Sequence, residues 1–281
     1  MKKYSEVLHE GIESLRQGKI ADCETDAWIL FEYCFGMNRT AYYLYMQEEA
    51  DMTKTQKYKK LLAKRLKHVP VQYITGHQEF MGLDFKVNED VLIPRQDTEL
   101  LVLKVLEVLE KKTNARVLDM CTGSGCIAIS ICKLAGQTMV TAVDVSDGAL
   151  KVAAENARLN QAEITLVKSD LFDEVEGTFD VIVSNPPYIE TSVIYELEPE
   201  VREFEPMLAL DGMEDGLYFY RRIIENAPSY LKNGGVIAFE IGYNQGETVP
   251  ELLHQAGFES VAVYKDLCGR NRVVMGSWKS K

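Results

Sequence analysis

The sequence predicts an α/β protein with a mostly parallel β-sheet, preceded by a small helical domain and a β-hairpin. Three observations lead to this fold class. Apolar residues recur at helical spacing through the first seventy residues. Strand-like and helix-like segments alternate after Pro94, which is typical of a parallel sheet with helices on both faces. Near the end, the strand-like segments 258–267 and 272–279 lie too close together for a crossover helix, so we expect them to pair antiparallel.

The N-terminal part reads as a helical domain. Segment 4–15 carries apolar residues at helical spacing, and segment 26–35 continues this pattern. Thr53 and Gln56 have the spacing of a capping box, which predicts that a further helix begins there. We therefore assign residues 1–71 to a helical domain.

The pattern of residues changes after this domain. Between residues 72 and 93, Phe80 and Phe85 flank Gly82 in a pattern that favours a β-hairpin, and we assign 72–93 as a connection. Residues 94–281 then form the sheet domain. Its predicted parallel strands are 115–120, 138–145, 164–171, 179–185 and 234–242.

Composition excludes several classes of function. The chain has 281 residues and a net charge of −12, which argues against broad nucleic-acid binding because that binding depends on a basic surface. No apolar run reaches membrane-spanning length, and charges interrupt the start of the chain where a signal peptide needs an apolar segment. The six cysteines form no CxxC pair and the four histidines lack metal-ligand spacing. We expect a cytoplasmic monomer with reduced thiols, no metal and no membrane contact.

A glycine-containing loop follows the first predicted parallel strand. It comprises Cys121, Thr122, Gly123, Ser124 and Gly125. The two glycines let the backbone approach a ligand closely. Such loops lie at the carboxyl edge of the sheet, where α/β proteins bind ligands. The same glycines also suit a tight strand-to-helix turn without any ligand, and the run "GSGCIA" satisfies the loose pattern of dinucleotide enzymes.

Acidic residues near the ends of successive strands favour S-adenosylmethionine over a dinucleotide. Asp119 lies at the entry to the loop. Its carboxylate would repel a pyrophosphate but suits an ammonium or sulfonium group. Asp144 ends the second strand, where it can accept hydrogen bonds from ribose hydroxyls. Asp170 can accept from an adenine amino group while Leu171 or Phe172 covers the ring. The chain also lacks a Tyr-x-x-x-Lys pair, a common arrangement for hydride transfer.

The tetrapeptide Asn185-Pro186-Pro187-Tyr188 follows the fourth parallel strand. The Asn185 side-chain oxygen and the Pro186 carbonyl can accept both N–H bonds of a planar amino or amide group, while Tyr188 offers a ring for stacking. Held in this way, a weakly nucleophilic nitrogen can direct its lone pair at a methyl donor, and no dedicated base is needed. A strand-terminating turn with a solvated asparagine is the alternative interpretation. Next to a predicted cofactor loop we favour catalytic roles for Asn185, Pro186 and Tyr188, and we expect Asn185 also to contact the cofactor.

Six motifs are spread over essentially the whole chain: "PVQYITG", "LIPRQDTELLV", "VLDMCTGSG", "SNPPYI", "FEPMLALDGMEDGL" and "GRNRVV". On these motifs the chain resembles the HemK/PrmC family of protein-(glutamine-N5) methyltransferases. The resemblance implies a class I, Rossmann-like methyltransferase sheet and, as partners, class I peptide chain release factors. Asn185 to Tyr188 would grip the glutamine of their Gly-Gly-Gln motif, and the helical domain would dock them. The resemblance also implies that Arg95 to Glu99, including Thr98, lines the methionine end of the cofactor pocket.

Two positions depart from the family pattern. Cys121 stands where the family usually has glycine, and a Cβ is tolerated there only with a negative φ. Gln96 replaces a proline, which we expect to cost some loop rigidity.

Two other functions fit parts of the sequence. An adenine-N6 methyltransferase acting on DNA or RNA could use the same tetrapeptide on a flipped base, and the basic run 54–67 would support it. The same run is also typical of a solvated helix face or of a contact surface for an acidic partner. A cofactor-binding regulator without catalysis is the second alternative, but a mere sensor has no use for an amide clamp.

Overall fold

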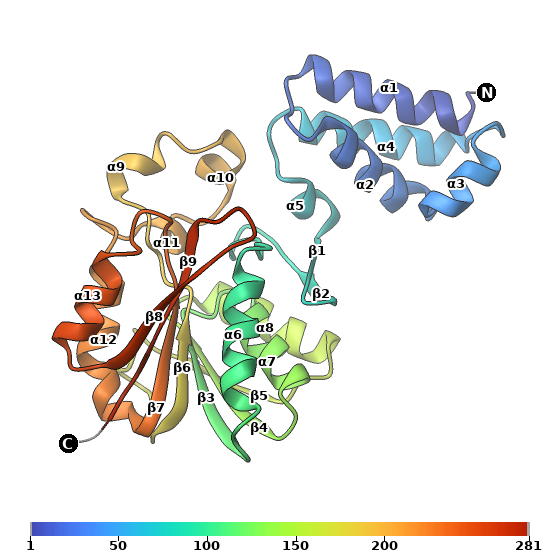
Figure 1. Cartoon of the computed structure of the whole chain (residues 1–281). Helices are drawn as coiled ribbons and strands as arrows, with labels where there is room; N and C mark the ends of the chain where they lie inside the picture. The colour runs from blue at the N-terminus through green and yellow to red at the C-terminus, as the bar shows by residue number, and fades with distance from the viewer. Residues whose placement is uncertain (1, 280–281) are drawn as a thin grey trace. The chain divides into compact units, whose positions relative to one another are not determined.

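The computed structural model describes residues 2–279, which form two compact units (Figure 1). The first unit runs to Gly76 and also contains Glu198–Phe204. The second unit comprises His77–Leu197 and the chain from Glu205 onward. A short stretch from the middle of the sequence thus belongs to the N-terminal unit, which the sequence did not predict.

The first unit is helical, as predicted. Its core is rich in aromatic rings, and Phe31 packs against Phe35 and Tyr58 with ring centroids 4.4 and 5.9 Å apart. Val7 and Leu15 from the first predicted helix are buried in the same core. Its helices are α1 (Tyr4–Gln17), α2 (Cys23–Phe35), α3 (Arg39–Tyr45), α4 (Met52–Arg65), α5 (Val71–Thr75) and α10 (Pro199–Phe204).

Two local predictions for this region were wrong. Helix α4 is capped by Asp51, whose side chain accepts from the Lys54 backbone N–H at 2.8 Å, and Thr53 already lies inside the helix. Asp is as good an N-cap as Ser and better than Thr, so a capping residue two positions earlier wins. Residues 72–75, which we assigned to the hairpin, form most of α5. The hairpin itself begins at His77 and belongs to the second unit.

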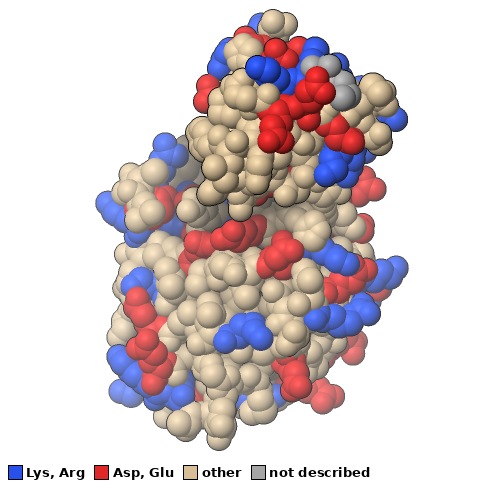
Figure 2. Space-filling model, turned by 90° about the vertical axis from the view of Figure 1, so that its right-hand side faces the viewer, with Lys and Arg blue, Asp and Glu red and all other residues tan. Residues whose placement is uncertain are grey.

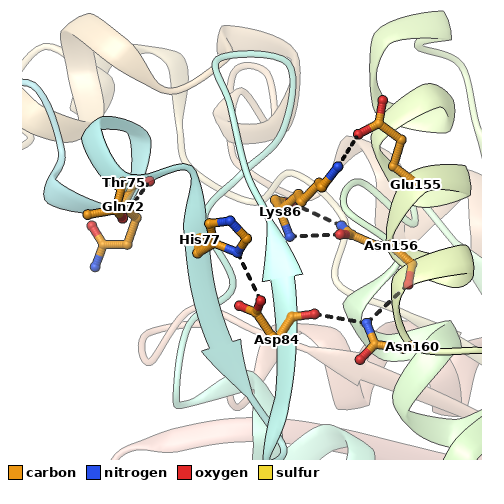
Figure 3. Close-up of polar contacts among 8 residues, drawn as sticks. All are labelled: Gln72, Thr75, His77, Asp84, Lys86, Glu155, Asn156 and Asn160. Atoms are coloured by element: carbon orange, nitrogen blue, oxygen red, sulfur yellow. Dashed lines mark hydrogen bonds and ion pairs between the residues drawn. The ribbon is translucent and has the colours of Figure 1, made fainter. Parts of the chain in front are cut away.

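The hairpin strands β1 (His77–Phe80) and β2 (Leu83–Lys86) are fixed to helix α8 (Asp147–Leu159) by an asparagine (Figure 3). The Asn156 side chain accepts from the Lys86 backbone N–H at 2.7 Å and donates to the Lys86 carbonyl at 3.0 Å. Its Nδ2 also donates to the Ser124 carbonyl at 2.9 Å. A single buried side chain therefore joins the hairpin to the glycine-containing loop.

The second unit is built on a sheet with the strand order β5-β4-β3-β6-β7-β9-β8. Neighbouring strands from β5 through β7 are parallel, and β9 pairs antiparallel with both β7 and β8. This confirms the predicted mostly parallel sheet with an antiparallel C-terminal pair. The strands are β3 (Ala115–Met120), β4 (Thr138–Asp144), β5 (Ile164–Lys168), β6 (Phe179–Ser184), β7 (Leu231–Glu240), β8 (Glu259–Lys265) and β9 (Asn271–Ser277).

Helices cover both faces of this sheet (Figure 1). On one face lie α6 (Thr98–Leu109), α7 (Cys126–Leu134) and α8, and on the other α12 (Tyr218–Tyr230) and α13 (Thr248–Gln255). Successive strands run outward in opposite directions from β3 and β6, so the carboxyl ends of these two neighbours form the topological switch point. Along the chain, the short helices α9 (Thr191–Ile194) and α11 (Met207–Leu210) follow β6 and precede α12. No helix within residues 2–279 is long and apolar enough to span a membrane.

Candidate active site

A cavity opens at the carboxyl edge of the sheet, where β3, β4, β5 and β6 end. Eleven predicted site residues line it: Arg95, Thr98, Cys121, Thr122, Gly123, Ser124, Asp144, Asp170, Leu171, Asn185 and Pro187. Asp119, Gly125, Pro186 and Tyr188 do not line it. The chain segments predicted to bind a cofactor and an amide therefore meet around one cavity.

The glycine-containing loop is held by hydrogen bonds to the end of β4. The Thr122 N–H donates to the Val143 carbonyl at 3.0 Å, and the Gly123 N–H donates to Asp144 Oδ2 at 2.9 Å. A Cβ built at Gly123 would meet no atom within 4 Å, and its φ is +55°. The left-handed conformation therefore favours glycine at position 123, and the backbone is open to a ligand.

Asp119 lies beneath the loop and organises it. Its Oδ2 accepts from Thr122 Oγ1 at 2.6 Å and from the Ala128 N–H at 3.2 Å, so it joins the loop to the first turn of α7. Complete burial raises the Asp119 pKa to about 7. Its Oδ1 is buried without a partner. Direct contact between Asp119 and a cofactor stays a prediction.

Two residues on the cavity wall have strained backbones. Cys121 has a φ of +61° and Leu171 a φ of +53°, in the left-handed region that disfavours residues with a Cβ. The expectation that a Cβ at position 121 is tolerated only with a negative φ is therefore wrong. Both residues follow the ends of parallel strands, where the chain turns sharply around the cavity, and strain of this kind clusters at functional sites.

The two acidic residues predicted to hold adenosine line the cavity. Asp144 accepts one backbone N–H on each oxygen, from Gly123 and Ser146, both at 2.9 Å. A carboxylate has about four acceptor sites, so capacity for ribose hydroxyls is left. Burial raises the Asp144 pKa. Asp170 is paired with Arg222 of α12 at 2.9 Å.

Sequence reasoning missed the residues that α12 and the segment before it contribute. Phe219 lines the cavity, as do Pro206 and Leu208. Leu208 belongs to α11, and shortly before this helix the buried carboxylate of Glu205 pairs with Arg95. No periodic or turn signal links these positions with the strand ends, because their meeting depends on how the chain packs. The motif "FEPMLALDGMEDGL" was the one available hint.

The Asn-Pro-Pro-Tyr turn is held from behind by side chains of other elements. Asn185 Nδ2 donates to Thr98 Oγ1 at 3.4 Å. The Tyr188 hydroxyl donates to Glu240 Oε1 at 3.3 Å, and the Tyr188 carbonyl accepts from Gln245 Nε2 at 3.1 Å. Burial raises the pKa of the Tyr188 hydroxyl well above its usual value. Tyr188 is thus fixed at both its backbone and its hydroxyl.

Arg272 adds a charged group to this support. Its Nη2 lies 3.1 Å from Asp97 and 3.3 Å from Asp266, and its side chain is 11% exposed. Asp266 in turn accepts the backbone N–H groups of Cys268 and Arg270, both at 2.9 Å. The turn near the C-terminus therefore anchors the start of α6.

The lining of the cavity fits S-adenosylmethionine. An open glycine backbone lies at one strand end, and Asp144 and Asp170, the predicted acceptors for ribose and adenine, lie at the next two; Leu171 and Phe219 supply apolar surface. Within the described residues 2–279, no cluster of His, Cys, Asp and Glu suits a metal ion.

Comparison with known proteins agrees with this geometry. Residues 97–198 match the "Methyltransferase small domain" family, and residues 6–76 match the "PrmC N-terminal domain". A release factor glutamine methyltransferase of Geobacter sulfurreducens is 41% identical over 271 residues, which cover 96% of this chain and 92% of that protein. The chain belongs to the release factor glutamine methyltransferase family. A family member from Streptococcus pneumoniae is 42% identical, with 94% of both chains covered.

A solved structure supports the fold assignment. The hMettl16 catalytic domain, crystallised with the MAT2A 3′UTR hairpin 6, matches with a TM-score of 0.59 and 18% identity over 74% of this chain and 80% of that one. At this identity the likeness concerns the fold alone. Membership of the family makes the chain a methyltransferase, and S-adenosylmethionine is its methyl donor.

Proposed function

We propose that this protein methylates the side-chain amide nitrogen of the glutamine in the Gly-Gly-Gln motif of class I release factors. Its relatives are named for release factor glutamine methylation and match it over nearly the whole chain. The observation that carries the proposal is the position of Asn185 on the wall of the cofactor cavity. Ser184 pairs with Met120, so the tetrapeptide and the glycine-containing loop leave adjacent strands side by side.

The chemistry follows from the poor nucleophilicity of an amide nitrogen, whose lone pair is delocalised. The Asn185 Oδ1 and the Pro186 carbonyl accept the two N–H bonds of the substrate amide and direct its lone pair into the cavity. When bound, S-adenosylmethionine supplies the methyl group as an electrophile. Orientation then provides most of the rate increase, because the proline turn cannot move the carbonyl away.

The remaining residues contribute binding and exclusion of water. Apolar side chains of Pro187, Leu208 and Phe219 line the cavity. The charge that develops during methyl transfer therefore lies in a partly dry site. The Tyr188 hydroxyl already donates to Glu240 and therefore does not serve as a base. The methylated amide nitrogen becomes acidic and loses its proton without one.

The adenine methyltransferase alternative is less well supported. Arg65, within the basic run 54–67, is buried and paired with Asp26 at 2.6 Å and Glu200 at 2.7 Å. On the face shown in Figure 2, Lys and Arg are interspersed with Asp and Glu on each unit, and the described residues form no continuous basic surface there. Nucleic-acid affinity depends on such a surface.

One experiment separates these functions. Labelled S-adenosylmethionine is incubated with the protein, a class I release factor and excess duplex or hairpin nucleic acid. We expect the label on the release factor, undiminished by the nucleic acid. Label on the nucleic acid would refute the proposal.

Asn185→Ala then tests the assigned role. Turnover should fall ~10²- to 10³-fold, as when one preorganised polar group is deleted, with little loss of cofactor affinity. Asn226→Ala is the matched control, because Asn226 is exposed on α12 and bonds to the Arg222 carbonyl of the same helix. Normal turnover of Asn185→Ala would show that Asn185 does not hold the substrate amide during methyl transfer.

A further inference from the structure

The proposed function requires the Pro186 carbonyl to stay in place, and the inference drawn here rests on that function. Proline fixes φ at positions 186 and 187 but leaves ψ free, so the carbonyl is immobile only if the chain is held on both sides of the prolines. On the N-terminal side Ser184 ends β6, and its hydroxyl donates to the Met120 carbonyl at 2.6 Å. On the C-terminal side Tyr188 lies outside the strands of the sheet, so other contacts must hold it.

Residues 206–216, which we call the backing segment, hold the chain that follows the prolines. The Ile189 N–H donates to the Leu210 carbonyl at 3.1 Å, and the Ile189 carbonyl accepts from the Gly212 N–H at 2.8 Å. Through these two bonds Ile189 and Asp211 form a parallel β-bridge. The bridge fixes the chain one residue beyond the tetrapeptide.

Two buried glycines bring the backing segment against the backbone of Tyr188. A Cβ built at Gly212 would lie 2.8 Å from Tyr188 Cα, closer than non-bonded atoms pack, and a Cβ at Gly216 would overlap the Tyr188 carbonyl oxygen. Gly216 has a φ of +69°, which disfavours other residues in any case. The φ of Gly212 lies outside the left-handed region. The close approach to Tyr188 therefore explains the glycine at position 212.

Two side chains reinforce this contact. Gln245 Nε2 donates to the carbonyls of Tyr188 and Gly216, both at 3.1 Å, so it joins the backing segment to the tetrapeptide. Asp211 Oδ1 accepts from the Thr191 hydroxyl at 2.6 Å and from the backbone N–H two residues after itself at 2.9 Å. The Asp211 bonds therefore hold the bend of the backing segment beside the chain that leaves the tetrapeptide.

We propose that Gly212 and Gly216 are positioning residues for methyl transfer. They let the backing segment immobilise Tyr188, so the tetrapeptide is held at its C-terminal end as it is held by β6 at its N-terminal end. The Asn185 side chain and the Pro186 carbonyl then keep the spacing that the two N–H groups of the substrate amide require. Neither glycine lines the cavity, so their replacement should affect turnover rather than cofactor binding.

Gly212→Ala tests the contact without adding backbone strain. The added methyl group displaces either Tyr188 or the backing segment. We expect kcat for release-factor methylation to fall ~10- to 100-fold, as for a misplaced catalytic group. The Kd for S-adenosylmethionine, measured by calorimetry, should stay close to the wild-type value because the cofactor wall is untouched.

Gly216→Ala and Gly136→Ala form a matched pair. Gly136 has a φ of +70°, close to that of Gly216, but a Cβ there would meet no atom within 4 Å, and Gly136 lies outside the cavity lining. Both substitutions introduce the same backbone strain, whereas only Gly216→Ala brings a Cβ against Tyr188. We expect kcat to fall at least ~10-fold in Gly216→Ala and to stay near the wild-type value in Gly136→Ala.

Asp211→Ala perturbs the backing segment without crowding it, at a position that is half-buried. It removes the acceptor of two hydrogen bonds. We expect kcat to fall ~3- to 10-fold, which corresponds to the worth of about one hydrogen bond. Asp211→Asn keeps an acceptor oxygen and should recover most of this loss.

The outcomes separate this role from the proposed function. Equal kcat in Gly212→Ala, Gly216→Ala and Gly136→Ala would overturn the positioning role but leave the amide clamp intact. Cofactor affinity lost in parallel with kcat would show that the glycines are merely structural, and would also overturn it. Where neither glycine variant folds, wild-type kcat in Asp211→Ala overturns the role, and a fall that Asp211→Asn restores supports it. Failure of the unmodified protein to methylate a release factor would instead refute the proposed function.

Discussion

The two walls of the cavity are supported in different ways. The cofactor wall, residues 121–125 with Asp144, is held by partners from one continuous stretch of chain, Asp119 to Asn156, which lie at most 32 positions away. The amide wall, residues 185–188, is held by partners 87, 52 and 57 positions away. Those partners are Thr98, Glu240 and Gln245.

This difference matters because the two walls have different tasks. A nucleoside can be held by a loop whose backbone and nearby carboxylates form one local unit. An amide clamp requires a fixed side-chain orientation, which a turn of two prolines and a half-buried asparagine cannot supply alone. The amide wall therefore depends on buried polar groups from α6, β7 and the segment after β7. The comparison predicts that distant substitutions damage turnover, whereas local ones damage cofactor binding.

The largest effect that would test this difference is expected at Gln245. Its side chain donates to the Tyr188 and Gly216 carbonyls, both at 3.1 Å, and accepts from the Gly242 N–H at 2.9 Å. Gln245→Leu leaves three backbone groups without partners, so we expect a loss of about 3 kcal/mol in the free energy of unfolding. Turnover should fall at saturating cofactor. Chemical denaturation and initial rates measure both effects.

The control for this change is Gln255→Leu on α13. Gln255 is exposed and bonds to Glu251 within the same helix, so its replacement should alter stability by less than ~0.5 kcal/mol. Equal effects of the two substitutions would mean that Gln245 does not support the amide wall.

On the cofactor wall, Asp144→Ala should show the opposite pattern. Hydrogen bonds to a charged group are worth roughly 1.5–3 kcal/mol, so we expect S-adenosylmethionine to bind ~10- to 150-fold more weakly by calorimetry. Turnover at saturating cofactor should change much less. Asp147→Ala is the control, because Asp147 is exposed, pairs with Lys168 and lies outside the cavity lining. Unchanged affinity in Asp144→Ala would place the ribose elsewhere.

The smallest effect concerns the strained backbone of the cofactor wall. Cys121→Gly removes the Cβ at a φ of +61°, whereas Cys121→Ala keeps it and removes the thiol alone. We expect the glycine variant to be more stable than the alanine variant by about 1 kcal/mol, after allowing for the greater freedom of glycine in the unfolded chain. Thermal unfolding of both variants measures the difference. A more stable alanine variant would show that residue 121 does not carry this strain.

Sequence reasoning predicted almost every residue of the cofactor wall. The loop 121–125, Asp144 and Asp170 were predicted from strand ends and glycine spacing, and all but Gly125 line the cavity. It did not reach the φ of Cys121, because whether a Cβ fits depends on the turn that the surrounding strands impose. It also placed the N-cap of α4 at Thr53, although Asp51 offered equivalent chemistry two positions earlier.

The sequence by itself determined the succession of the sheet strands along the chain, the antiparallel C-terminal pair and the tetrapeptide at the end of β6. These features depend on periodicity and on turn residues, which act between neighbours in the chain. Only the tertiary structure placed Phe219 in the cavity wall. It also placed Glu205 beside Arg95, and Glu240 and Gln245 beside Tyr188. Their side chains come from elements far apart in sequence, and packing of helices on a sheet brings them together. Desolvation in that packed interior then makes each buried polar group require a specific partner.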